Sequence, residues 1–291
     1  MNSPWQVAVP AGAELGERPV WDGRAGEIVW VDIPAGQVHA YRDHLADRVV
    51  VRADTSVGAA APRAGGGYVL AAGDGFRLVD AAGRAEGSVR RPAGMGPEHR
   101  FNDGACDPAG RFYAGTTTFA GIAGASVLYR LDPDASIHVV ATGITESNGL
   151  AWSPDGSRLY YVDSGGPTIW VHAYDPDTAR LGARHILVDI EAGAGVPDGL
   201  ATDAEGGVWV ALWGGGSVRR YEPDGRLSVH LDLPVPLVTC PGFGGPGLDE
   251  LYVTSAWQGM SRAERVGYPM AGHVFCTRPG VRGQPVTPFA G

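Results

Sequence analysis

A repeat of about 40 to 50 residues constrains the fold more than any other feature of this sequence. Short apolar segments recur at that spacing: EIVWVD (27–32), GYVLAA (67–72), RFYAG (111–115), RLYYVD (158–163), GVWVAL (207–212) and ELYVTS (250–255). Most are followed by a second strand-like segment that ends in a turn rich in Gly, Asp or Pro. A period of this length, with about four short strands in each copy, is typical of a β-propeller blade.

Six copies fill the chain, so we expect an all-β fold, a six-bladed β-propeller that forms a single domain over residues 1–291. The segment WQVAVP (5–10) is left over, and we expect this N-terminal strand to complete the last blade, because closure removes a sheet edge. No segment of ten or more residues has a period of 3.6, so helices should be few. The 45 glycines and 22 prolines suit many short strands joined by turns.

Charge and cysteine usage exclude several classes of function. The net charge is −9 and no cluster of Lys and Arg is present, which argues against a nucleic-acid partner. No segment has the roughly 18 apolar residues of a membrane helix, and the N-terminus lacks the pattern of a signal peptide. Cys106, Cys240 and Cys276 form no CxxC pair, so free thiols are expected. We expect a cytoplasmic protein with no membrane partner, either a monomer or a weak homodimer.

Polar residues occupy one register of the repeat, five positions before the turn that precedes each strand. This register holds Glu17, Gly58, Asn102, Asn148, Asp198 and Cys240. The first strand of a propeller blade lines the central channel, so these positions should converge on the axis. Two carboxylates and two amide carbonyls are hard oxygen donors that suit a divalent cation. Asn-Gly and Asp-Gly are also ordinary turn dipeptides, which is the alternative interpretation of each residue taken singly.

Other sequence motifs offer little competing chemistry. The chain has no G-x-S-x-G, H-E-x-x-H or Walker motif. Two DPD tripeptides, at 132–134 and 175–177, lack the full spacing of an EF-hand loop and its last Glu. We interpret both as hairpin turns in which Asp caps its own backbone.

Several segments of the chain resemble a known family. They are LGERPVWD (15–22), RFNDGACDPAGRFYAGT (100–116), SNGLAWSPDGSRLYYVDS (147–164), the stretch that begins PDGLATDAEGG (197–225) and ELYVTSA (250–256). They resemble the SMP-30/gluconolactonase/luciferin-regenerating family, which includes regucalcin, and the resemblance covers nearly the whole chain. It implies a six-bladed propeller and, for most characterised members, a sugar-acid lactonase with one divalent cation in the channel.

By this resemblance the metal ligands are Glu17, Asn148 and Asp198, while Arg100 and Asn102 contact the substrate. The metal is Ca²⁺, Zn²⁺, Mn²⁺, Mg²⁺ or Fe²⁺, since oxygen ligands accept all of them. Asp198 is also the candidate catalytic general base, and a metal-bound hydroxide is the alternative nucleophile.

The sequence departs from the family pattern at two places. Regucalcin-like members have a Glu after an AGTM stretch, where this chain reads AGTTTFAG and places Phe119, or Thr118 if the loop shifts. An aromatic wall formed by Phe119 in the substrate-binding site favours a different or less hydroxylated lactone. Arg18 replaces the commoner Gly after the metal-binding Glu, and we expect it to add positive charge near the rim of the channel.

The expected function is that of a metal-dependent hydrolase that opens the ring ester of a sugar-acid lactone, a small-molecule substrate. Two alternatives stay open at this stage. One is a non-catalytic calcium-binding propeller, and the other is an esterase or phosphotriesterase that uses the same metal site.

Overall fold

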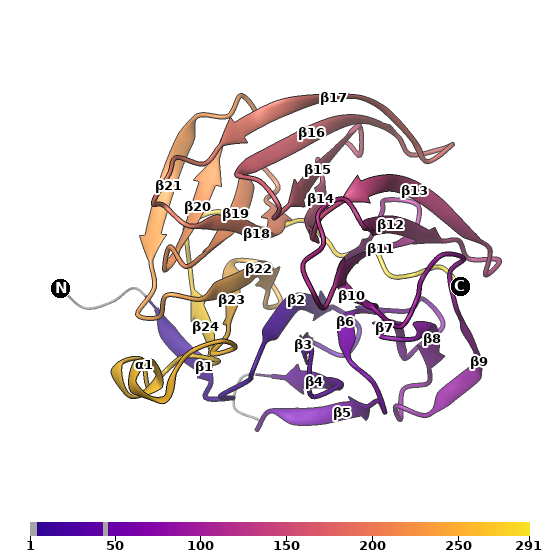
Figure 1. The fold of residues 1–291 in the computed structure, drawn as a ribbon, viewed down its shortest axis with the longest axis horizontal. Coiled ribbons are helices and arrows are strands. Elements are labelled where there is room, and N and C mark those ends of the chain that lie inside the picture. The colour runs from indigo at the N-terminus through magenta and orange to yellow at the C-terminus, as the bar shows by residue number, and fades with distance from the viewer. Residues whose placement is uncertain (1–4, 43–45) are drawn as a thin grey trace.

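Six four-stranded antiparallel sheets surround a central axis in the computed structural model, which describes residues 5–42 and 46–291 (Figure 1). Blade 1 contains β2 (Gly16–Asp22), β3 (Glu27–Asp32), β4 (Gln37–Tyr41) and β5 (Arg48–Arg52). Blade 2 contains β6 (Val57–Pro62), β7 (Tyr68–Ala72), β8 (Gly75–Val79) and β9 (Ala85–Arg90). Blade 3 contains β10 (His99–Cys106), β11 (Phe112–Thr118), β12 (Ser126–Leu131) and β13 (Ile137–Ile144).

The second half of the chain repeats this arrangement. Blade 4 contains β14 (Ser147–Trp152), β15 (Arg158–Asp163), β16 (Thr168–Asp175) and β17 (Arg180–Asp189). Blade 5 contains β18 (Val196–Thr202), β19 (Val208–Trp213), β20 (Ser217–Tyr221) and β21 (Leu227–Asp232). Blade 6 contains β22 (Val238–Gly244), β23 (Glu250–Ser255), β24 (Val274–Thr277) and β1 (Gln6–Val9). The predicted six-bladed propeller is therefore confirmed.

The N-terminal strand closes the ring. β1 pairs with β24 in antiparallel register, with Gln6 opposite Cys276 and Val7 opposite Phe275. The outer edge of blade 6 thus receives its fourth strand from the start of the chain. This confirms the predicted closure, in which the two ends of the propeller share one sheet.

The innermost strands are the first strands of the blades, and glycine lets them approach one another. A Cβ atom at Gly149 would lie 2.5 Å from the Asp198 carbonyl oxygen of the next blade, and one at Gly199 would lie 2.4 Å from Cys240 Sγ. Asn148-Gly149 and Asp198-Gly199 lie within β14 and β18, so neither pair is a turn. The glycines are needed here for close packing of neighbouring blades around the axis.

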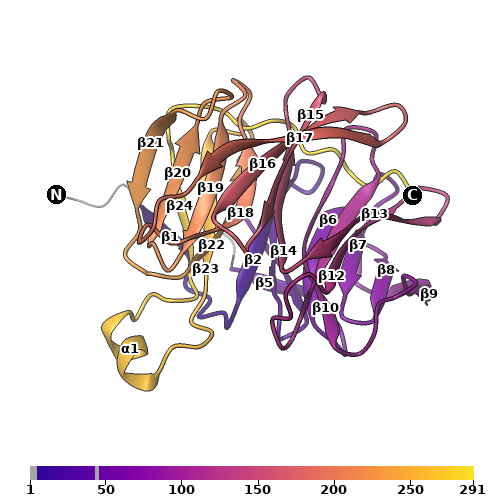
Figure 2. The same cartoon turned by 45° about the horizontal axis from the view of Figure 1, so that its top comes forward.

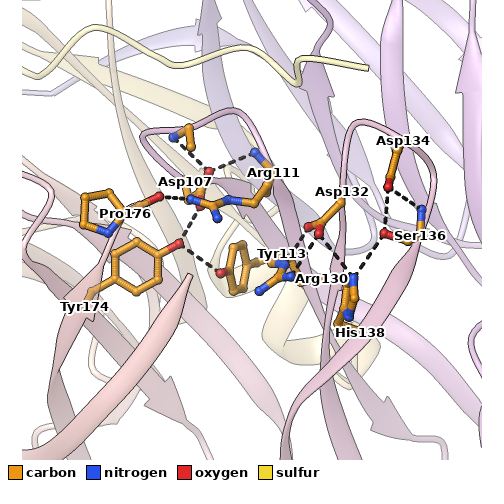
Figure 3. Close-up of polar contacts among 11 residues, drawn as sticks. Asp107, Arg111, Tyr113, Arg130, Asp132, Asp134, Ser136, His138, Tyr174 and Pro176 are labelled. Carbon is orange, nitrogen blue, oxygen red and sulfur yellow. Dashed lines mark hydrogen bonds and ion pairs between the residues drawn. The ribbon is translucent and has the colours of Figure 1, made fainter. Parts of the chain in front are cut away.

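Buried aromatic residues and turn networks join the blades further out. Asp107, in the turn after β10, accepts hydrogen bonds from the backbone N–H of Arg111 at 2.8 Å and from the hydroxyl of Tyr174 in blade 4 (Figure 3). The Tyr174 hydroxyl also lies 3.0 Å from that of Tyr113. One buried turn of blade 3 is thereby tied to blade 4, which fixes the angle between the two sheets.

The DPD tripeptides form capped turns, as predicted. In the first, Asp134 Oδ1 accepts hydrogen bonds from the backbone N–H of Ser136 at 2.9 Å and from its hydroxyl at 2.6 Å (Figure 3). In the second, Asp175 Oδ1 accepts from the backbone N–H of Asp177 at 3.0 Å. Each of these carboxylates accepts hydrogen bonds from donors within its own turn.

Helix α1 (Arg262–Gly267) is the single α-helix of the described residues and projects away from the blades (Figure 2). It lies in the long connection between β23 and β24 and begins at Ser261, whose side chain forms a capping box with Glu264. Within residues 5–42 and 46–291, no helix is long and apolar enough to cross a membrane.

Candidate functional site

A cavity of about 290 Å³ lies where the innermost strands begin. Its lining residues are Leu15, Glu17, Arg100, Asn102, Glu146, Asn148, Ser164, Val196, Asp198, Trp213 and Gln258. The fold therefore brings together five of the six residues that the sequence predicted for the site, from blades 1, 3, 4 and 5.

A β-bulge in each first strand explains why these side chains face the channel. The ladder between the first and second strands shifts register between Glu17 and Val20 in blade 1, and between Ser147 and Leu150 in blade 4. Blade 5 has the same irregularity between Pro197 and Leu200. A bulge leaves residues unpaired and re-aims their side chains. The repeat thus positions one polar side chain at the same height in each of blades 1, 3, 4 and 5.

Unpaired acceptors in this cavity fit a cation. Glu17, Asn148 and Asp198 are only 4%, 5% and 6% exposed. Asn148 Oδ1 and Asp198 Oδ1 are buried and have no hydrogen-bond partner among the described residues. Asn148 Nδ2 donates to Ser164 Oγ at 3.0 Å, so the amide oxygen is left as the available atom. A buried acceptor without a partner is costly, and a bound cation would remove that cost.

The electrostatics of the carboxylates point the same way. Burial raises the pKa of Glu17 to about 8, and the negative charge of Asp103 adds to this effect. Burial also raises the pKa of Asp198 well above its usual range, with further contributions from Glu17 and Glu146. Two neighbouring buried carboxylates are not readily ionised together, and the charges of Arg18 and Arg100 only partly offset the rise in the pKa of Glu17. A divalent cation between them would supply additional positive charge.

The candidate ligand set combines two carboxylates with one neutral amide oxygen. The part of the chain that the structure describes has no group of three or more His, Cys, Asp or Glu side chains that could hold a metal ion. Any cation in the cavity would therefore depend on the amide oxygen of Asn148 as well as on Glu17 and Asp198. Such a mixed oxygen set suits a hard divalent cation.

Arg100 and Asn102 form a hydrogen-bonded pair on the cavity wall. Arg100 Nη1 donates to Asn102 Oδ1 at 2.6 Å and to the Phe101 carbonyl oxygen at 3.1 Å. Asn102 Nδ2 in turn donates to the Ser147 carbonyl oxygen at 3.0 Å, which joins blade 3 to blade 4. Burial lowers the pKa of Arg100, an effect that the nearby charges of Glu146, Glu17 and Asp198 oppose. The guanidinium is thus held in a fixed orientation among acidic groups.

The Arg18 side chain does not lie at the rim of this cavity, where we expected it. Arg18 Nη1 contacts Asp103 Oδ2 at 3.3 Å, and Nη2 donates to the Leu150 carbonyl oxygen at 3.2 Å. The side chain lines a second cavity, of about 330 Å³, at the opposite end of the channel. Arg18 also has a positive φ of 46°, which turns the chain after Glu17 so that the two side chains serve opposite ends.

Phe119 also lies away from the described residues that line the site cavity. It is 70% exposed, in the connection between β11 and β12, and its backbone N–H donates to the Glu98 carbonyl oxygen at 3.0 Å. Its neighbour Thr118 is buried and accepts a hydrogen bond from the Ile122 N–H at 2.8 Å. A contact between Phe119 and substrate stays a prediction.

The sequence analysis missed several cavity residues, of which Glu146 carries the most chemistry. Glu146 stands two positions before Asn148 and so lies outside the polar register of the repeat. It forms an isolated bridge with Thr117 of blade 3. That contact exists only once two blades are side by side, so no local pattern could have revealed it. Ser164 and Gln258 come from connecting segments and carry no repeat signal either.

Comparison with known proteins agrees with this architecture. The sequence model of the SMP-30/gluconolactonase/LRE-like region matches residues 15–257. A 6-deoxy-6-sulfogluconolactonase of Pseudomonas putida is 36% identical over 294 residues and covers 100% of both chains. Regucalcin of Xenopus laevis is 36% identical over 286 residues, with 96% of this chain and 95% of that protein covered.

A solved structure is similarly close in fold. The calcium-binding protein regucalcin of Agrobacterium tumefaciens has a TM-score of 0.90 and 28% sequence identity, covering 97% of this chain and 96% of that one. A family match over most of the chain, full-length relatives above 30% identity and the same fold agree with one another. The chain therefore belongs to the SMP-30/gluconolactonase/LRE-like family.

Proposed function

We propose that this protein is a metal-dependent lactonase that opens the ring ester of a sugar-acid lactone in the cavity around Asp198. The observation that carries the proposal is the convergence of Glu17, Asn148 and Asp198, two of which present buried oxygen atoms without a partner. Relatives named as lactonases support the reaction class.

Glu17, Asn148 and Asp198 would hold one divalent cation, whose identity among Ca²⁺, Zn²⁺, Mn²⁺, Mg²⁺ and Fe²⁺ is left open. When bound, such a cation supplies a Lewis acid for the lactone carbonyl and lowers the pKa of water. The calcium-binding relative supports a divalent cation as the cofactor.

Asp198 is the proposed general base. Hydrolysis adds the oxygen of water to the lactone carbonyl carbon and breaks the bond between that carbon and the ring oxygen. Asp198 would accept the proton of the attacking water and return it to the ring oxygen, so that the product is an open-chain hydroxy acid. A bound cation would lower the pKa of this carboxylate and so make Asp198 only a modest base.

Arg100 and Asn102 are the proposed substrate-binding pair. The guanidinium can donate hydrogen bonds to ring or hydroxyl oxygens of the lactone. Asn102 holds Arg100 through the 2.6 Å bond and is itself fixed by the Ser147 carbonyl. Trp213 and Leu15 supply apolar surface in the same cavity.

A hydrolysis screen tests this function. Chelator-treated protein would be reloaded with each divalent metal and assayed on lactones of five- and six-carbon sugar acids, beside aryl esters and organophosphates. We expect metal-dependent opening of the sugar-acid lactones. Equal rates for chelated and reloaded protein would refute metal dependence, and faster turnover of organophosphates would favour the phosphotriesterase alternative. Metal binding without turnover of any substrate would favour the calcium-binding alternative.

A further inference from the structure

Glu146 is a cavity carboxylate to which the proposed reaction assigns no role. It immediately precedes β14, and its backbone is fixed on both sides. Its N–H donates to Asp163 Oδ1 at 2.9 Å, and its carbonyl oxygen accepts from the Ser164 N–H at 3.0 Å. The bridge to Thr117 adds a contact with blade 3. The backbone that carries this side chain is therefore held rigidly at the junction of two blades.

The Glu146 carboxylate is available to a ligand. Its side chain lines the cavity and is half-buried. Within residues 5–42 and 46–291 it forms no hydrogen bond or ion pair, although its charge interacts with that of Arg100. Every oxygen of an ionised carboxylate is an acceptor, whereas every N–H of a guanidinium is a donor. Together, Glu146 and Arg100 present an acceptor and a donor on one wall.

A hydroxyl group is the ligand chemistry that uses both functions, since it donates one hydrogen bond and accepts others. Unsubstituted lactone rings have acceptor oxygens but no donor, so they would gain nothing from Glu146. The pair can therefore discriminate between lactones by their hydroxyl groups. A site built to bind a hydroxyl rejects an analogue that lacks it, because the buried polar group is then left unpaired.

The position of Glu146 bears on the expectation drawn from Phe119. Residues 117 and 146 are bridge partners, so Glu146 reaches the cavity from beside the strand end that leads to residue 119. Phe119 itself is turned outward and is 70% exposed. An acidic side chain therefore reaches the cavity from the blade beside the segment that carries Phe119.

We propose that Glu146 is a specificity-determining residue that accepts a hydrogen bond from a hydroxyl group of the substrate. This inference rests on the proposed function, because it takes the cavity around Asp198 to be the lactone site. It opposes the less hydroxylated substrate that Phe119 alone suggests.

The test compares Glu146→Gln with wild type on two rings of equal size, D-glucono-δ-lactone and δ-valerolactone, which has no hydroxyl group. For gluconolactone we expect a rise in KM of roughly 10- to 100-fold, the usual effect of losing a hydrogen bond to a charged group. For valerolactone we expect kcat/KM to change less than about twofold. Equal losses on both substrates, or no loss on gluconolactone, would overturn the proposal.

Two controls separate a binding role from a structural one. Glu98→Gln removes an exposed carboxylate near Phe119 that does not line the cavity, and should leave both substrates unaffected. The metal content of Glu146→Gln should equal that of wild type, because loss of metal would make its effect indirect and contradict the proposal.

Calorimetric binding of xylitol, an open-chain polyol, distinguishes failure of this inference from failure of the proposed function. Weaker binding to Glu146→Gln than to wild type supports the role of Glu146 even if neither protein opens a lactone. Equal binding to both proteins, or no binding to wild type, would overturn it even if the lactonase activity is real.

Discussion

The two ends of the channel are built from the same six strands but differ in the side chains that these strands present. At one end, the polar register places Glu17, Asn102, Asn148 and Asp198 around a cavity of about 290 Å³. Three residues further along each first strand, the side chains are apolar and line the cavity of about 330 Å³ at the other end: Val20, Ala61, Ala105, Ala151, Ala201 and Phe243.

The propeller therefore forms a cavity at each end. The side chains of the polar register decide which of the two cavities can bind a cation and a substrate. Both cavities are of similar volume and both are formed by converging strands. Among the described residues, only the cavity of about 290 Å³ is lined by buried side-chain oxygen atoms without a hydrogen-bond partner. Arg18 and Asp103 stand between the two registers in the sequence; Asp103 is fully buried, and Arg18 lines the cavity of about 330 Å³.

The largest expected effect is a loss of lactonase activity, and two substitutions in β18 test which end of the channel is responsible. Asp198→Asn removes the proposed base and weakens a metal ligand, so lactonase activity should fall about 10²- to 10⁴-fold. Ala201→Ser, three residues away in β18, should leave kcat/KM unchanged because it faces the opposite cavity. Steady-state kinetics check both variants. Similar losses of kcat/KM in the two variants would contradict the assignment of the reaction to the cavity around Asp198.

The Arg18–Asp103 ion pair tests whether the polar groups between the two registers have a structural role. Arg18→Met leaves the Asp103 carboxylate, which is fully buried, without its positive partner. We expect the free energy of unfolding in urea to fall by about 3–5 kcal/mol. The double variant Arg18→Met/Asp103→Leu should recover most of that loss, since no charge is then left uncompensated. Wild-type stability of the single variant would contradict this role.

Removal of the metal should lower the stability of the protein because the cavity that contains Asp198 loses its cation. A cation present at 100 times its dissociation constant stabilises the folded state by about 2.7 kcal/mol. Chelation should therefore lower Tm, and adding back the metal should restore it. Asp198→Asn should show a smaller shift on chelation, whereas Ala201→Ser should shift as much as wild type. Differential scanning calorimetry measures this, and identical shifts in all three proteins would argue against a cation held by Asp198.

The smallest effect concerns the thiol of Cys106, which lines the cavity of about 330 Å³. Burial raises the pKa of this thiol, and the negative charge of Asp107 adds to the rise. The thiolate is the reactive form, so at pH 8 the folded protein should label at Cys106 at least about tenfold more slowly than the urea-unfolded chain. Labelling should increase as the pH rises above the usual thiol range. Mass spectrometry after iodoacetamide treatment reports the site, and rapid labelling at pH 8 in the folded state would contradict the expectation.

Local pattern in the sequence was enough to predict the blades and their polar register. The repeat of apolar segments and turns gave six sheets, because strand alternation and turn chemistry are properties of short stretches. The unpaired segment at residues 5–10 predicted the closing strand for the same reason. Four of the register positions, including Asn148 and Asp198, do meet in one cavity.

The sequence by itself therefore determined the fold and the polar end of the channel, since each copy of the repeat encodes the same local geometry. Only the tertiary structure decided which cavity the Arg18 side chain lines, how exposed Phe119 is and that Glu146 lines the cavity around Asp198. Each depends on a bulge, a surface connection or a contact between two blades. Such features arise when strands from different copies pack side by side, and no single copy carries a signal for them.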